Sequence, residues 1–234
     1  MEGWITGIGW VTAAGFGLGR DALQQPFQAG QLEIPKRKQI FEKPDMRFGR
    51  LDEFSRIGLA AIAFCLRDAE REVWQQKREI GIIAASRYGC LQTDLAYMDT
   101  LMLEQGQLAS PNLFAYTVAN SFLGEAALRF GLNGGSFVLN QGDRTGLAAL
   151  RIALEDLAWS EQEGVLAGIS DLNPPPEFAD EDFHPGSLFL LMEKEQQERA
   201  YGKLASVADE VFFNSVKVQN LEELIAACLA EKHS

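Results

Sequence analysis

The segment FVLNQGDRTGLAAL, residues 137 to 150, has the pattern of a site that performs chemistry. A short apolar stretch precedes a polar turn that contains glycine, and an apolar, leucine-rich stretch follows. This pattern predicts a strand, a tight turn and a helix, which together expose the turn residue and direct backbone N–H groups and the helix dipole toward it. A nucleophile would be well placed there. The turn itself consists of Asn140, Gln141, Gly142, Asp143, Arg144 and Thr145.

The cysteines are the other side chains with nucleophilic chemistry. Cys65, Cys90 and Cys228 are odd in number and widely spaced, with no CxxC pair, which argues against a disulfide framework or a zinc site. Cys90, in SRYGCLQTD, could be a surrogate nucleophile, but a small buried apolar residue is the preferred interpretation. The glycines of GIGWVTAAGFGLG do not have the spacing of a dinucleotide-binding fingerprint. We therefore expect no metal and no cofactor.

Composition and charge restrict the class of protein. The chain has 234 residues, enough for one domain with an ample core, and its 47% hydrophobic content is typical of a folded soluble protein. A net charge of −12 disfavours nucleic acid and anionic membranes as partners. The basic stretch 36–50 is a local exception, either a docking patch for an acidic partner or a solvated loop. With no membrane span and no signal peptide in the pattern, we expect a cytoplasmic protein.

The order of strand and helix patterns predicts the fold class. Short apolar strand patterns alternate with helix patterns along the chain, which favours a mainly parallel sheet with helices on both faces. Ser55 is the expected cap of the first long helix, and Asn220 with Glu223 has the pattern of a capping box for the last one. We expect strands at 3–12, 79–86, 137–139, 164–170 and 187–192, and an edge or antiparallel strand at 203–213. We expect helices at 55–69, 145–159 and 220–232, and a loop at 171–186. The segment 111–131 should form one helix, or two that meet near Gly124.

Several segments together resemble the N-terminal half of β-ketoacyl synthases, the thiolase-fold enzymes that condense acyl chains in fatty-acid and polyketide assembly. They are ITGIGWVTAAGFG, LDEFSRIGLAAIAFCLRDA, EIGIIAASRYGCLQTDLAYMDTL and SPNLFAYTVANSFLGEAALRFGLNG, in that order. The resemblance covers residues 1–212, with 213–234 as a strand end and a helix. It implies an α/β fold of half a thiolase, with α-β-α layers, a mainly parallel mixed five-stranded sheet and one β-ketoacyl synthase N-terminal-like domain over 1–234.

Asp143 departs from the family at its most important position. The family turn has the pattern T-A-C-x-S-G, and alignment on Thr145 and Gly146 places Asp143 where the catalytic Cys stands. A Cys works there as a thiolate, which a carboxylate cannot replace in transthioesterification. The family also takes two catalytic histidines from a second half, whereas His184 and His233 lie in no matching motif. The resemblance therefore implies an inactive homologue.

The resemblance further implies a partner. It favours a non-catalytic subunit, similar to a chain-length factor, that pairs with a full-length β-ketoacyl synthase and meets acyl carrier protein only indirectly. A homodimer is the other pairing. Family dimers pair through the strand before the nucleophile turn, so we expect contact over 112–140. The candidates for the acyl tunnel or the dimer contact are Phe114, Tyr116, Phe122, Phe137, Val138 and Leu139, with core packing as the alternative for the aromatic residues.

Two other functions are also compatible with the sequence. The chain could be a stand-alone enzyme that uses Asp143 as a general base or carboxylate nucleophile on a thioester. It could also be an acyl-binding regulatory module that forms homodimers. Asp143 itself could simply cap the helix that follows it or pair with Arg144.

Overall fold

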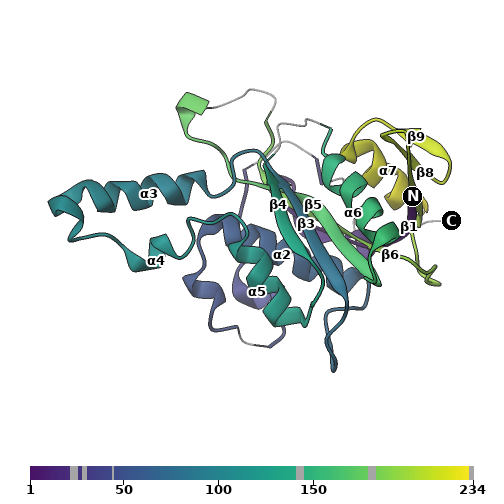
Figure 1. Ribbon diagram of the computed structural model, residues 1–234, viewed down its shortest axis with the longest axis horizontal. Coiled ribbons are helices and arrows are strands. Elements are labelled where there is room, and N and C mark those ends of the chain that lie inside the picture. Colours follow the sequence, from purple (N-terminus) through teal and green to yellow (C-terminus); the bar gives the residue numbers. More distant parts are fainter. Residues whose placement is uncertain (22–25, 28–30, 44, 141–144, 179–182, 232–234) are drawn as a thin grey trace.

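The computed structural model describes residues 1–21, 26–27, 31–43, 45–140, 145–178 and 183–231 (Figure 1). Within these residues the strands form one sheet in the order β4-β3-β5-β6-β1-β7-β8-β9, and β2 pairs with β1. Its central strands are β1 (Glu2–Thr12), β3 (Ile80–Ser86), β4 (Ser136–Asn140), β5 (Gly164–Asp171) and β6 (Gly186–Glu193).

The direction of the five central strands confirms the predicted sheet. β3 pairs in parallel with both β4 and β5. β6 is antiparallel to β5 on one side and to β1 on the other, so β1 points the same way as β3, β4 and β5. Four of the five strands therefore share one direction. The completely buried, apolar sequence of β3 is what a strand covered on both faces requires.

The sheet continues beyond the predicted five strands. β7 (Gly202–Val207), β8 (Glu210–Phe213) and β9 (Val216–Val218) extend it with antiparallel pairings, and β2 (Gly15–Leu18) adds a short strand beside β1. The stretch 203–213 was expected to be a single strand, and it is a hairpin. The reason is local, because Ala208 and Asp209 have positive φ angles of 50° and 66°, as a tight hairpin turn requires.

Helices cover both faces of the sheet. α2 (Glu53–Asp68) and α5 (Ser121–Phe130) pack on one face, while α6 (Ala148–Trp159) and α7 (Leu221–Glu231) pack on the other (Figure 1). The helix predicted at 145–159 corresponds to α6, and its leucines at helical spacing are all buried: Leu147, Leu150, Leu154 and Leu157. The remaining helical segments are η1 (Gly19–Asp21), α1 (Arg37–Ile40), η2 (Phe48–Arg50), α3 (Leu91–Met102), η3 (Leu103–Gly106), α4 (Pro111–Phe114) and η4 (Pro176–Phe178).

The start of α2 corrects the predicted cap. Asp52, not Ser55, is the N-cap residue, and its Oδ1 accepts a hydrogen bond from the Ser55 backbone N–H at 3.0 Å. Glycine in β1 then lets this helix lie directly on the sheet. A Cβ atom added at Gly9 would stand 2.1 Å from the Cys65 backbone nitrogen and 2.4 Å from the Ala61 carbonyl oxygen. Only a residue without a side chain fits at that contact.

The segment 111–131 forms two helices, α4 and α5, but they do not meet near Gly124. The break spans 115–120, and Gly124 lies inside α5. α5 ends at Phe130, and its cap residue Gly131 has a left-handed φ of 64°, as is common after a helix C-terminus. α3, η3 and α4 form an arm, residues 91–118, that projects away from the sheet (Figure 1).

The predicted cap of the last helix is confirmed with one change. Asn220 Oδ1 accepts from the Glu223 N–H at 2.8 Å, and Glu223 Oε2 accepts from the Gln219 N–H at 2.7 Å rather than from Asn220. The apolar face of α7 is buried. Among the described residues, no helix combines the length and the apolar character needed to cross a bilayer.

Asn220→Ala should therefore destabilise the protein modestly. Loss of the cap leaves one N–H of the first turn unpaired, which costs about 1 kcal/mol and lowers Tm by about 2–4 °C in a chain of this size. Thermal unfolding followed by circular dichroism measures the shift. Gln219→Ala is the matched control, because it keeps its backbone N–H and should leave Tm unchanged. Equal shifts in both variants would contradict the capping role.

Candidate functional site

Three strands end side by side at one edge of the sheet. Ser86, Asn140 and Asp171 are the last residues of the parallel strands β3, β4 and β5. The carboxyl ends of parallel strands are where open α/β sheets form their sites. The predicted nucleophile turn follows Asn140 directly, but Asp143 lies outside the described residues, as does His233. The place of Asp143 in the site remains a prediction. Its role as a helix cap or as an ion-pair partner of Arg144 also remains a prediction.

The residues that follow this turn are braced by α7. Gly146 has a left-handed φ of 70°, and a Cβ atom there would stand 3.1 Å from Leu221 Cβ. The Leu221 N–H donates to the Thr145 carbonyl oxygen at 2.8 Å, and the Leu147 N–H donates to Thr145 Oγ1 at 3.2 Å. The C-terminal helix thus fixes the chain directly behind the turn. Sequence reasoning missed this contact, because 213–234 lies outside the family pattern.

Asp171 organises the loop that leads into the arm. Its carboxylate accepts hydrogen bonds from Ser86 Oγ at 2.8 Å, the Tyr88 N–H at 2.8 Å and the Arg87 N–H at 3.0 Å. Ser86 Oγ in turn accepts from the Gly89 N–H at 2.7 Å. The side chain is buried, and burial raises the pKa of Asp171, while the hydrogen bonds partly offset that increase. Asp171 was expected only as the first residue of a loop.

Tyr88 connects the same loop to the chain after β5. Its hydroxyl donates to the Phe178 carbonyl oxygen at 2.9 Å, and its ring lies edge-on to Phe183 with 5.1 Å between centroids. His184 follows, exposed, just before β6. The described parts of the predicted loop 171–186 therefore pack against the base of the arm.

The cysteine thiols are buried and unpaired with one another. Cys90 is the N-cap of α3, and its Sγ stands 3.6 Å from both carboxylate oxygens of Asp94. Burial and the neighbouring negative charge of Asp94 raise the pKa of Cys90 to about 12. A thiol with this pKa is protonated at neutral pH, so Cys90 is a poor nucleophile. This agrees with the interpretation as a small buried residue.

The structure separates the three aromatic tunnel candidates. Phe122 is fully buried, with its ring edge-on to Phe54 at 5.4 Å and to Phe189 at 6.2 Å between centroids. It is a core residue. Phe114 is 61% exposed on the arm, and Tyr116 packs partly against the core. A tunnel or contact role stays a prediction, and the geometry leaves room for it at Phe114 and Tyr116.

The three candidates in β4 lie at the edge of the sheet. Phe137 is 41% exposed, while Val138 and Leu139 pack partly against the clusters on opposite faces. The Ile82 N–H donates to the Gly135 carbonyl oxygen at 2.9 Å. In a parallel ladder successive residues face alternate neighbours, so Ser136, Val138 and Asn140 direct their N–H and C=O groups away from β3. No other described strand pairs with β4.

The arm exposes several large apolar side chains. Its side chains form a surface that begins well before residue 112, where contact was expected to start. The missed signal is the helical spacing of apolar residues from position 95 onward, although exposure itself needs the structure. The large apolar residues exposed on the arm are Leu95, Met98, Met102, Leu103, Leu108, Phe114 and Val118.

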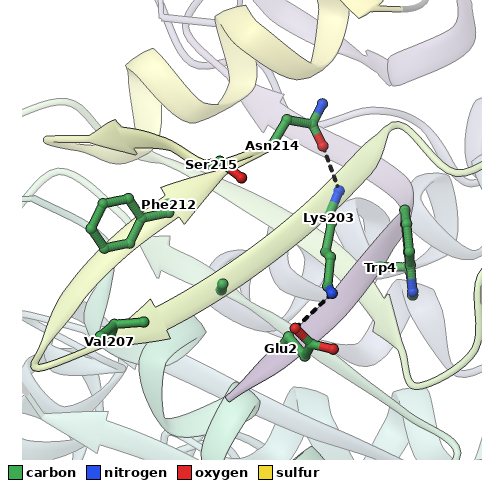
Figure 2. Close-up of a pocket in the computed structure, with 8 residues that line it drawn as sticks. Glu2, Trp4, Lys203, Val207, Phe212, Asn214 and Ser215 are labelled. Carbon is green, nitrogen blue, oxygen red and sulfur yellow. Dashed lines mark hydrogen bonds and ion pairs between the residues drawn. The ribbon is translucent and has the colours of Figure 1, made fainter.

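A shallow hollow lies at the other side of the sheet, on β1, β7 and β8 (Figure 2). Trp4, Val207 and Phe212 supply its apolar lining. Lys203 crosses it, with Nζ 2.6 Å from Glu2 Oε2 and its backbone N–H donating to Asn214 Oδ1 at 2.9 Å. Because the charges are paired and no predicted site residue lies there, this hollow is not the candidate site.

The profile of the β-ketoacyl synthase N-terminal domain matches residues 33–180, more than half of the chain, which confirms the resemblance. No curated protein matches significantly. Among solved structures, a type II polyketide synthase acyl-carrier protein in complex with its ketosynthase bound to the hexaketide gives a TM-score of 0.67 at 18% identity, covering 88% of this chain and 67% of that one.

Two further solved structures contain chain-length factors. The ishigamide ketosynthase/chain length factor gives a TM-score of 0.66 at 14% identity, covering 87% of this chain and 62% of that one. A ketosynthase, ApeO, in complex with its chain length factor, ApeC, from Xenorhabdus doucetiae gives 0.59 at 21% identity, covering 83% and 80%. At these sequence identities, the structural similarity shows a ketosynthase-type fold. The chain spans about two thirds or less of the length of the first two matched chains.

Proposed function

The chain belongs to the family of β-ketoacyl synthase N-terminal domains, and from that membership we propose that it is a non-catalytic, chain-length-factor-like subunit. It would pair with an active β-ketoacyl synthase in polyketide- or fatty-acid-type chain assembly. The observation that carries the proposal is Asp143, a carboxylate at the position of the family's catalytic Cys. Solved ketosynthase and chain-length-factor complexes of the same fold support it.

The chemistry of Asp143 explains the expected loss of catalysis. A helix N-terminus behind the turn would stabilise a carboxylate as an anion. Loading an acyl chain requires a nucleophile that attacks a thioester and leaves again as a good leaving group, as a thiolate does. A carboxylate would have to form a mixed anhydride with a thioester, a reaction that favours the starting materials.

Two surfaces within the described part of the chain support pairing with a synthase. β4 offers outward-facing N–H and C=O groups at the edge of the sheet, and the arm exposes several large apolar side chains. Unpaired edges and apolar patches of this kind promote aggregation unless a partner covers them. A charge of −12 also disfavours direct docking of an acidic carrier protein, so carrier contact would come through the synthase.

Reconstitution tests the proposal through Asp143. The protein alone should not turn over malonyl or acyl thioesters, while a host synthase that pairs with it should condense them. Asp143→Asn should leave the activity of the reconstituted pair within about twofold of the wild type, because the side chain makes no covalent intermediate. Thioester consumption and product formation by mass spectrometry measure both expectations.

Asp209→Asn is the matched control, because Asp209 lies in the β7–β8 turn at a backbone conformation that Asn also adopts. Turnover by the protein alone, abolished in Asp143→Asn and kept in Asp209→Asn, would replace this proposal by the stand-alone enzyme that uses Asp143.

A further inference from the structure

The arm carries acidic charge inside its apolar surface. From Leu91 to Leu128 the sequence contains Asp94, Asp99, Glu104 and Glu125 and no Lys, Arg or His. The charge is therefore of one sign over the whole arm and the start of α5. Such a segment attracts a surface of opposite charge and repels a surface like itself.

One carboxylate lies within an exposed apolar stripe. Leu95, Met98 and Met102 lie at helical spacings of three and four residues along α3, and they are 40%, 46% and 75% exposed. Asp99 is also exposed, and its position four residues after Leu95 and three before Met102 places it on the same side of the helix. A partner that covers this stripe must also cover Asp99.

Covering Asp99 has a chemical requirement. A carboxylate that loses water without gaining a cation or hydrogen-bond donors is strongly unfavourable. Apolar contact alone would therefore not suffice for the partner surface. The partner has to place a Lys or Arg side chain against Asp99, within an otherwise apolar surface that fits the leucine and methionine side chains.

A second copy of this chain does not meet that requirement. It would present the same acidic arm, and its net charge of −12 would oppose association. Three basic side chains near the arm are engaged within the chain itself. Arg129 Nη1 stands 2.7 Å from Asp45 Oδ2, Arg47 Nη1 stands 3.5 Å from Glu125 Oε2, and the Arg87 guanidinium lies over the Tyr88 ring.

We infer that the arm binds a different chain, through an apolar surface with a Lys or Arg facing Asp99, and that this charge pattern selects a heterodimer over a homodimer. The inference rests on the proposed function only for the identity of that chain, an active β-ketoacyl synthase. The carboxylate acts in partner selection, and the leucine and methionine side chains supply the contact area.

Charge reversal at Asp99 tests the inference. Each β-ketoacyl synthase encoded by the host is purified and titrated with wild-type protein, Asp99→Lys and Glu222→Lys by calorimetry. Asp99→Lys should weaken binding of the synthase that pairs with the wild type by at least about 30-fold, since loss of a close interfacial charge pair costs 2–5 kcal/mol. Glu222→Lys is the matched control, with the same change in net charge at an exposed site on α7, and should bind within about threefold of wild type.

The outcomes separate the two proposals. Wild type should sediment as a monomer when alone and bind one synthase. If wild type binds a synthase and Asp99→Lys binds equally well, the role of Asp99 is wrong and the subunit function stands. If wild type binds no host synthase, or sediments alone as a stable homodimer, both the heterotypic arm and the proposed function are overturned.

Discussion

Val138→Lys is expected to abolish assembly with the partner synthase. Val138 is the middle residue of β4, and its backbone N–H and C=O point away from β3 toward the open edge. A lysine at an edge strand prevents pairing with another strand, because its charge would be buried without a partner at the interface. We expect binding to weaken by at least about 100-fold, measured by calorimetry against the synthase that pairs with the wild type.

The control for this experiment is a matched valine. Val207, in β7 at the other side of the sheet, is 61% exposed, so Val207→Lys makes the same chemical change away from β4. Its binding should equal that of the wild type. Because Val138 also packs partly against the core, Ser136→Pro is a second variant that removes only an outward-facing N–H from an exposed residue. Thermal unfolding of each variant shows which of them remain folded.

If folded Val138→Lys and Ser136→Pro variants both bind the synthase as tightly as wild type, β4 is not the pairing strand. The arm alone would then have to carry the contact. A loss of binding in Val207→Lys as well would indicate that the chain pairs through a different surface.

Asp171→Ala should strongly destabilise the protein. The carboxylate is 9% exposed and holds Ser86 Oγ and the backbone N–H groups of Arg87 and Tyr88, and alanine would leave these donors without an acceptor. Hydrogen bonds to a charged group contribute 1.5–3 kcal/mol, so we expect a loss of about 3–5 kcal/mol in the free energy of unfolding. Urea denaturation measures it.

The effect should also be local to the base of the arm. Hydrogen exchange at the amides of 87–91 should accelerate in Asp171→Ala even where the rest of the sheet stays protected. Glu177→Ala is the matched control, an exposed carboxylate in the chain that follows β5, and should change neither quantity. Equal stability of Asp171→Ala and wild type would mean that the loop is held by other contacts, such as those of Tyr88.

Elements with a strong local signal were predictable from the sequence. β3 is apolar from Ile80 to Ala85, α6 has leucines at helical spacing, and the α7 cap follows from Asn220 and Glu223. In each of these the hydrophobic period or the capping chemistry decides the structure within a few residues. The direction of the five central strands was predictable through the family resemblance.

The sequence-based predictions were wrong where the structure depends on which one of several suitable residues makes a contact, or on a local backbone conformation with no sequence signal. Ser55 and Asp52 are both good helix caps, and only the structure shows which side chain bonds to the free N–H. The hairpin within 203–213 depends on a left-handed turn at residues that are not glycine. The break between α4 and α5 falls at 115–120 and not at Gly124, because a glycine inside a helix is tolerated.

The candidate site was predictable only in part for the same reason. Asp171 and Ser86 are 85 positions apart and meet because β3 and β5 are neighbours in parallel register. Leu221 meets Gly146 because α7 packs on the same face of the sheet as α6. No local pattern contains either contact. The exposure of the arm is likewise a property of the fold, since an apolar helix face has the same sequence pattern whether it is buried or open.

Native mass spectrometry of the protein isolated from its own host, by a tag on its N-terminus, tests the central claim most directly. The account predicts a complex of one copy of this chain with one copy of a full-length β-ketoacyl synthase that contains the nucleophilic Cys and two catalytic His. Isolation of the protein only as a monomer or a homodimer, with thioester turnover that Asp143→Asn abolishes, would contradict the account.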